Sequence, residues 1–232
     1  MTTPSLKMLS SMATRELLRE LAAAYQAASS HPVLSEAAGG VDVAKRVHAG
    51  EAVDVVVLAR AAIDKLAADG KVFAATRVDL VQSGIAVAVR AGAPLPDVSC
   101  EAAVKAAVQA AKTLSYSSGP SGVYLEKTFE RWGIFHAVRS RIVVPPPGVP
   151  VGSLVASGKV ELGFQQLSEL MNLGGVAVVG MLPPDIQSMT TFSGAIATVS
   201  TAVAAAQGLL DFMASPDRAA LKARHGMEPG TT

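Results

Sequence analysis

The stretch VDVVVLA, residues 53–59, decides the fold of this chain. It is short, rich in β-branched residues and uncharged apart from Asp54, a composition typical of a strand buried on both faces of a parallel sheet. A helical pattern follows over residues 61–68 and is stopped by Gly70. A strand that leads directly into a helix predicts the βα unit from which parallel sheets with covering helices are built.

The same alternation extends toward the N-terminus. Residues 6–10 form a short apolar run, and residues 13–28 place apolar side chains on one helical face and charged ones on the other. Residues 31–35 are predicted to form a strand, and residues 41–49 a helix that starts after a glycine pair. The order βαβαβα favours a mainly parallel sheet flanked by helices.

A second α/β series follows toward the C-terminus, between two long strand-like runs. The runs are residues 78–90 and 187–200. Between them we expect helices over 102–111 and 123–132, a short helix around Leu154, and extended segments over 113–116, 141–144, 160–164 and 176–179. Two helices, residues 202–213 and 216–225, end the chain.

This order predicts one lobe interrupted by another. We expect residues 1–82 and 186–232 to form a discontinuous first lobe, and residues 83–185 to form the second. The two long strands would then be the crossings that serve as a hinge, with a ligand cleft between the lobes.

Composition excludes several classes of protein. The chain has 232 residues, 50% of them hydrophobic, and a net charge of +1, so it can bury a core and offers no basic patch for nucleic acid. The single cysteine, Cys100, excludes an internal disulfide, and the four histidines lack the spacing of metal ligands. We therefore expect no metal and no cofactor.

The sequence contains neither a secretory signal nor a membrane span. Residues 1–7 lack a basic region and a long apolar run, and the run 53–59 is too short to cross a bilayer. Two locations stay open: periplasmic if the chain is a mature or trimmed form, and cytoplasmic if it is the full native chain.

Strand-to-helix turns at one edge of an open parallel sheet are the places where such folds bind ligands, because helix N-termini there present free N–H groups. The first turn holds Ser10, Ser11 and Met12, where Ser11 is either an anion donor or a plain helix cap. The second holds Gly39 and Gly40, which either let the backbone approach a ligand or form an ordinary turn.

The third turn opens a helix of the second lobe and is rich in hydroxyl groups and glycine. Its sequence, SSGPSGV over residues 117–123, carries no charge and is not a phosphate loop, because no Gly-Lys-Ser/Thr follows. Its candidate anion donors are Ser118, Gly119, Ser121, Gly122 and Val123. Ser/Gly turns are common, so the motif alone is weak.

A few further polar residues are candidates. Arg60 directly follows the strand 53–59 and could clamp a carboxylate bidentately, although most arginines are solvated. Ser83 lies in the first crossing strand. Gln165 and Gln166 follow the run VELGF, where they could orient a ligand or simply cap a helix.

With these segments placed, the chain resembles the molybdate-binding-protein-like branch of type II periplasmic binding proteins. The resemblance covers nearly the whole chain and is carried by these ordered segments: LLRELAAAYQ after Ser10–Ser11, RVHAGEAVDVVVLA, SGIAVAVRAGAP, SSGPSGVYLEKTFERWGI, ASGKVELGFQQLSEL and GLLDFMASPDRAALKARHGMEP. It implies the two-lobed α/β fold, a monomer, a small anionic ligand and, if the protein is exported, an ABC permease as partner.

The resemblance also implies where the ligand would be held, and the sequence departs from that pattern. In molybdate binders a first-strand Ser, a Ser in the next glycine turn and a hinge-side Tyr hold the oxyanion. Here the glycine turn reads Ala38-Gly39-Gly40, Gln165-Gln166 stand where the Tyr is expected, and Arg60 follows the third strand. These differences favour an organic carboxylate over a molybdate-type oxyanion.

Three functions follow from this resemblance. The first is a solute-binding protein without turnover. The second is an isomerase acting on a small polycarboxylate, because a similar subgroup of the family includes aconitate isomerase, which shifts a double bond by removing a proton next to a carboxylate. The third is a cytoplasmic ligand sensor. For the enzyme, the sequence nominates anion holders but no catalytic base.

Overall fold

The structure, a computed structural model, describes residues 4–146 and 149–230. It divides into two compact units. Unit 1 comprises Met1–Gln82 and Thr191–Thr232, and unit 2 comprises Ser83–Thr190. The chain leaves unit 1 within strand β4 (Val78–Arg90) and returns to it within strand β8 (Met189–Ile196).

Unit 1 is built on a mainly parallel sheet. Strand β1 (Leu6–Ser11) lies between β2 (Val33–Ala38) and β3 (Val55–Ala59) and is parallel to both. β8 extends this sheet antiparallel to β3, and β4 follows β8. The short strand β9 (Glu228–Pro229) pairs with β4.

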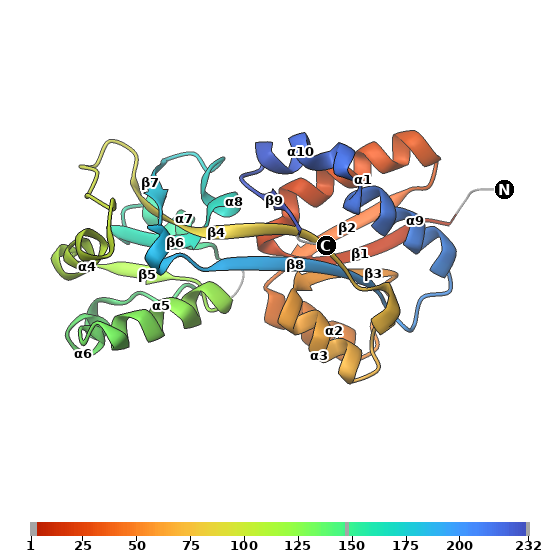
Figure 1. Ribbon diagram of the computed structural model, residues 1–232, viewed down its shortest axis with the longest axis horizontal. Helices are drawn as coiled ribbons and strands as arrows, with labels where there is room; N and C mark the ends of the chain where they lie inside the picture. Colours follow the sequence, from red (N-terminus) through yellow and green to blue (C-terminus); the bar gives the residue numbers. More distant parts are fainter. Residues whose placement is uncertain (1–3, 147–148, 231–232) are drawn as a thin grey trace. The chain divides into compact units, whose positions relative to one another are not determined.

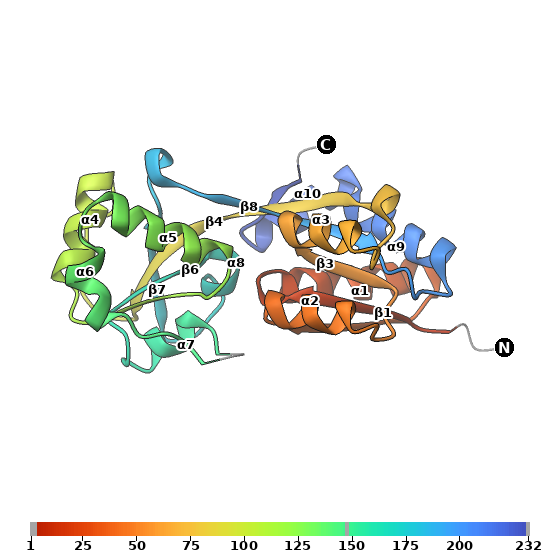
Figure 2. The same cartoon turned by 90° about the horizontal axis from the view of Figure 1, so that it is seen from below.

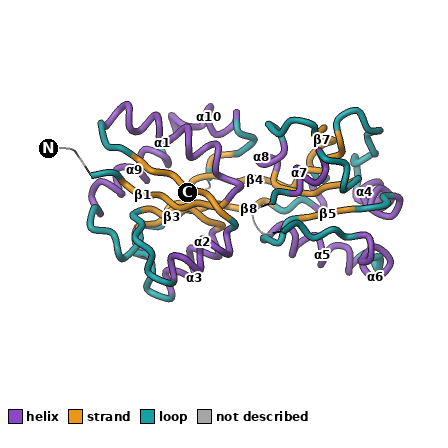
Figure 3. Tube along the Cα trace, turned by 180° about the vertical axis from the view of Figure 1, so that it is seen from behind, coloured by secondary structure: helices purple, strands orange, loops and turns teal. Residues whose placement is uncertain are grey.

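Helices cover both faces of the unit 1 sheet (Figure 1). On one face lie α1 (Arg15–Ser29), α9 (Val203–Ala214) and α10 (Ala219–Arg224). On the other lie α2 (Gly40–His48) and α3 (Arg60–Ala68). The Cα trace shows the strands enclosed between these two helical layers (Figure 3), which explains why 53–59 is apolar on both sides of the strand.

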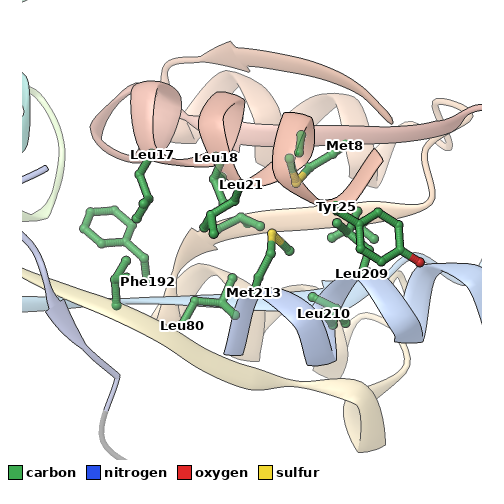
Figure 4. Close-up of a cluster of buried hydrophobic side chains, with 14 of the residues drawn as sticks. Met8, Leu17, Leu18, Leu21, Tyr25, Leu80, Phe192, Leu209, Leu210 and Met213 are labelled. Carbon is green, nitrogen blue, oxygen red and sulfur yellow. The ribbon is translucent and has the colours of Figure 1, made fainter. Parts of the chain in front are cut away.

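Residues from both ends of the chain form the core under α1 and α9. Leucines of α1 meet Leu209, Leu210 and Met213 of α9 over side chains of β1, β4 and β8 (Figure 4). These three α9 residues are fully buried. The C-terminal segment is therefore part of the same core as the N-terminal 82 residues.

Unit 2 has a smaller, mixed sheet. β5 (Leu114–Tyr116) is parallel to β6 (Leu162–Gln166), whereas β4 is antiparallel to both β6 and β7 (Val176–Met181). The expectation of a mainly parallel sheet was therefore wrong for this unit. β4 enters as a crossing strand and not from a βα crossover, so nothing obliges it to run parallel to its neighbours.

The unit 2 helices also form two groups (Figure 2). α4 (Glu101–Ala110), α5 (Pro120–Arg131) and α6 (Phe135–Val138) pack around one cluster of buried side chains that includes Phe129 and Phe164. α7 (Val151–Ala156) and α8 (Leu167–Leu170) contribute to two smaller clusters. Short 3₁₀ turns lie at Met12–Thr14, Ala74–Thr76, Arg139–Arg141, Pro184–Ile186 and Pro216–Arg218.

Most expected elements exist, and several have different limits. The strand expected over 31–35 lies at Val33–Ala38. The one expected over 160–164 lies at Leu162–Gln166, so both glutamines are inside the strand and not beyond it. The run 187–200 is strand only over Met189–Ile196, because only an isolated bridge at Ala197 follows before the chain turns.

Two further expectations need correction. The helix expected from Val123 begins at Pro120, since proline at the first helical position supplies the right φ and lacks an N–H that would be unpaired there. The segment expected to be extended over 141–144 begins instead in a 3₁₀ turn, and its only ladder contact among the described residues is the bridge between Ile142 and Leu114. In the described part of the chain, none of the helices combines the length and apolar character needed to cross a membrane.

Candidate ligand-binding site

The first strand-to-helix turn brings Ser11 next to a hydroxyl and not to a helix N–H. Ser11 Oγ lies 3.4 Å from Thr14 Oγ1, and Thr14 Oγ1 donates to the Ser11 carbonyl at 3.1 Å. Ser11 makes no side-chain cap bond to the turn Met12–Thr14. Its hydroxyl is therefore not used as a conventional cap.

Ser10 lies deeper in the sheet. It is fully buried, and its Oγ has no hydrogen-bond partner among the described residues. Side chains alternate along a strand, so Ser10 and Ser11 leave opposite faces of β1. A buried hydroxyl without a partner is uncommon and calls for an explanation, such as a bound group or water.

The glycine turn lies beside Ser11, as the parallel register of β1 and β2 requires. Ser11 is opposite Ala38 in that register. A methyl group placed on Gly40 would lie 3.9 Å from Ser11 Cβ, and one placed on Gly39 would lie 3.2 Å from Asp42 Oδ2. The structure thus brings the first two candidate turns together, with an acidic side chain, Asp42, at the start of α2.

Arg60 is the first residue of α3, and it is ion-paired. Its Nη1 lies 3.1 Å from Asp79 Oδ2, and its Nε lies 4.0 Å from Asp64 Oδ2. Arg77 contacts the same two carboxylates at 3.4 and 3.5 Å, and Ser193 Oγ donates to Asp79 Oδ1 at 2.6 Å. The two arginines and two aspartates balance in charge, so Arg60 is not an isolated cation, although its side chain is 48% exposed.

The third turn is closed by its own hydroxyls. Ser117 Oγ and Ser121 Oγ are 2.9 Å apart. Gly119 caps α5, and its carbonyl accepts from the N–H of Gly122 at 3.0 Å and of Val123 at 3.2 Å. These N–H groups are already satisfied, which leaves the hydroxyl of Ser118 and the exposed side of the turn to meet a ligand.

Gly122 is required by packing. A methyl group there would clash with the Ser117 carbonyl oxygen, because the two atoms would come far closer than any non-bonded contact allows. The glycine is thus fixed by the close return of the turn against the helix. Ser117, Ser118, Gly122 and Val123 line a pocket of about 420 Å³ that lies entirely within unit 2.

The two glutamines of β6 have different surroundings. Both the oxygen and the nitrogen of the Gln165 amide are bonded within unit 2: its Oε1 accepts from the Gly152 N–H at 3.0 Å and its Nε2 donates to Glu169 at 2.7 Å. This arrangement fixes the start of α7, a structural role.

Gln166 contacts Ser83, which was predicted from the sequence as a separate candidate. The Gln166 amide lies 2.9 Å from Thr190 Oγ1. With its oxygen accepting from that hydroxyl, its nitrogen donates to the Ser83 carbonyl at 2.8 Å and the Ser83 hydroxyl at 3.1 Å. Both residues are buried, so the amide connects β6 to β4 and to the start of β8.

Sequence reasoning missed several polar partners. Asp79 lies on β4 and pairs with Arg60, Ser193 lies on β8 and donates to Asp79, and Thr190 binds Gln166. Asp79 was visible as the one acidic residue in the otherwise uncharged run 78–89, a signal for a buried partner. Among the described residues, no cluster of three His, Cys, Asp or Glu side chains could hold a metal ion.

The fold and these strand-end turns define the class of protein. Two α/β units, one interrupting the other in sequence, are the fold of periplasmic binding proteins. The structure resembles the periplasmic molybdate-binding protein of Azotobacter vinelandii, with a TM-score of 0.81 and 19% identity, covering 98% of this chain and 100% of that one. It also resembles a sulfate-binding protein of Mycobacterium tuberculosis, with a TM-score of 0.79 and 17% identity over 97% of this chain and 86% of that one.

The chain belongs to the family of bacterial extracellular solute-binding proteins, whose family model matches residues 6–228. Members are typically periplasmic and typically work with ABC-transporter permeases. An aconitate isomerase from Pseudomonas sp is 39% identical over 233 residues, covering 97% of this chain and 88% of the relative. The expected α/β fold of the periplasmic-binding-protein type is thus confirmed.

Proposed function

We propose that this protein binds a small organic polycarboxylate of the aconitate type. The observation that carries the proposal is the 39% identity with aconitate isomerase over 97% of the chain. The molybdate- and sulfate-binding structures, at 19% and 17% identity, share the fold and say less about the ligand. A guanidinium group pairs with carboxylates in a planar, bidentate manner, which suits a polycarboxylate.

The proposed hydrogen-bond donors to this polycarboxylate come from both units. Unit 1 would supply Ser11, the backbone of Gly40 and the guanidinium of Arg60, whereas the buried Ser10 leaves the opposite face of β1 and is not one of these donors. Unit 2 would supply Ser118 and the turn that Gly122 closes. The flanking candidates of these turns are Met12, Gly39, Gly119, Ser121 and Val123. Ser83 and Gln166 link β4 to β6, and Gln165 supports α7. The protein would act as a monomer, with a permease as partner where it is exported.

Thermal shift and calorimetry test the ligand class. The purified chain would be titrated with trans-aconitate, cis-aconitate, citrate, succinate, molybdate and sulfate. We expect a tricarboxylate to raise the melting temperature, since a ligand present at 100 times its Kd stabilises the folded state by about 2.7 kcal/mol. Stabilisation by molybdate or sulfate but by no carboxylate would overturn the proposal.

A second candidate function is isomerisation of that ligand, favoured by the same relative. Proton NMR of aconitate incubated with the protein distinguishes the two, because isomerisation changes the vinyl and methylene signals whereas binding alone does not. A spectrum that stays unchanged while calorimetry reports binding would leave the solute-binding function and remove the enzyme.

A further inference from the structure

The unit 2 pocket contains two opposite charges that do not pair with each other. Glu126 and Arg139 both line it, together with Tyr116, Ser117 and Ser118. Within residues 4–146 and 149–230, neither charged side chain has an ion pair or a hydrogen bond to another residue. Oppositely charged groups that line one cavity without contacting each other leave room for a polar ligand.

The local structure explains why these residues meet. Gly122 and Glu126 are four residues apart on α5 and share its face. Phe135 and Arg139 have the same spacing at α6 and the turn that follows it. Figures 1 and 2 both show α6 beside α5, so a face of each segment borders the pocket. Its volume, about 420 Å³, is in the range of small-ligand sites, roughly 300–1,000 Å³.

An acidic side chain is electrostatically unfavourable in a pocket whose only role is to bind an anion. Glu126 would repel a ligand carboxylate and lower its affinity. The same carboxylate is useful if it faces a C–H bond next to a ligand carboxylate, because it can then accept the proton.

The other polar groups suit the charge that proton removal creates. Burial, with smaller effects of Glu126 and Glu130, raises the pKa of Tyr116 to about 12, so its hydroxyl keeps its proton and can donate. Ser118 adds a hydroxyl that lines the pocket, and Arg139 adds a full positive charge. Donors aimed at developing negative charge stabilise such an intermediate more than they stabilise the bound ligand.

We propose that Glu126 is the proton acceptor of an allylic isomerisation and that Arg139 anchors the ligand carboxylate next to the reacting carbon. This inference rests on the proposed polycarboxylate function. The Glu126 carboxylate takes a proton from the ligand's methylene carbon, and the C–H electron pair delocalises through the adjacent double bond and carboxylate. The Glu126 carboxylic acid then returns the proton to the far carbon of the three-carbon system. The double bond moves, Glu126 is regenerated, and no oxidant or reductant is needed.

The test compares Glu126→Gln with Glu130→Gln, which lies one turn further along α5 and is exposed. For each variant we would measure aconitate isomerisation by NMR, exchange of the ligand's methylene hydrogens in D₂O, and affinity by calorimetry. We expect Glu126→Gln to lose at least about 100-fold in isomerisation and exchange, the scale of general-base catalysis, while binding is kept or tightened. Glu126→Asp should recover part of the rate, and Glu130→Gln should match the wild type.

Arg139→Gln, with the exposed Lys127→Gln as its control, should weaken binding about tenfold or more. If the wild type binds no carboxylate, the proposed function itself fails and the inference falls with it. If the wild type binds but neither isomerises nor exchanges hydrogen, binding stands and the role of Glu126 is wrong. Full isomerase activity in a folded Glu126→Gln variant would overturn the inference even if the wild type is an isomerase.

Discussion

Arg60 is held by carboxylates from two different elements. It is the first residue of α3, and its side chain pairs with Asp64 of the same helix and with Asp79 of β4. Its carboxylate partner Asp79 is 19 residues away on β4, and the Ser193 that holds Asp79 comes from β8. Sequence spacing cannot reveal partners that only the sheet order brings together.

We predict that Arg60→Ala weakens carboxylate binding at least about tenfold, the scale of a lost charge-assisted hydrogen bond. The reason is that the remaining carboxylates, Asp64 and Asp79, would repel an anion once one of their two cations is removed. Calorimetry measures the affinity. Arg19→Ala is the control, since that side chain is 75% exposed and pairs only with Glu16 among the described residues. Equal affinities of folded Arg60→Ala and wild type would contradict the assignment.

Gly122→Ala should destabilise the protein by about 1–3 kcal/mol or more, the cost of forcing extra volume into a packed site. The methyl group would meet the Ser117 carbonyl oxygen, a backbone atom that cannot rotate away. Urea unfolding measures the change in the free energy of unfolding. Gly174→Ala is a matched control, because a methyl group there has no neighbour within 4 Å. If Gly174→Ala lowered the free energy of unfolding as much as Gly122→Ala, the close approach of the Ser117 carbonyl to Gly122 would not be the cause.

At the scale of elements, it was easier to predict that a helix or strand exists than at which residues it begins and ends. The strand 78–90 was predicted residue for residue, because its alternation is long and an arginine stands just before it and another at its end. The helix after Gly119 was placed too late, because serine and glycine suggested a loop although Pro120 can begin a helix. The four-residue helices Phe135–Val138 and Leu167–Leu170 were not predicted, since a single turn carries too little periodicity to recognise.

The contact between α1 and the end of α10 predicts a pH dependence of stability. A hydrogen bond from His225, aided by Arg224, lowers the pKa of Glu20 below its usual value. A carboxyl group with a lowered pKa stabilises the folded state above its unfolded-state pKa, and this contribution is lost as the pH falls through the folded-state value. The effect is small, because the Glu20 side chain is 45% exposed.

Melting curves of wild type and Glu20→Gln across the acid range test this contact. The wild type should melt higher at neutral pH, and the difference should vanish in acid. Glu130→Gln, an exposed carboxylate in unit 2, serves as the comparison and should track the wild type throughout. A Glu20→Gln curve that coincides with the wild type at neutral pH would rule out a stabilising contact.

At the scale of the whole molecule, the alternation of strands and helices was sufficient to predict the α/β class. The direction of strands in unit 2 could not be predicted, since β4 and β7 pair antiparallel through contacts remote in sequence. The candidate site residues stay a prediction, and the structure shows only which of them lie together. Ser11 and Gly40 do lie together, as do Ser83 and Gln166, whereas Glu126 and Arg139 had no local motif and were seen only once α5 and α6 were packed.

The division of the chain makes a last prediction about independent folding. Unit 2 is one continuous segment, Ser83–Thr190, and its main cluster of buried side chains is complete within it. Unit 1 is discontinuous: the cluster under α1 needs Phe192, Ile196, Leu209 and Leu210 from the C-terminal segment. We expect a fragment of residues 83–190 to unfold cooperatively in urea, and a fragment of residues 1–82 to lack cooperative unfolding until residues 191–232 are added. Circular dichroism during the titration measures both, and cooperative unfolding of residues 1–82 alone would show that the C-terminal helices are dispensable to that core.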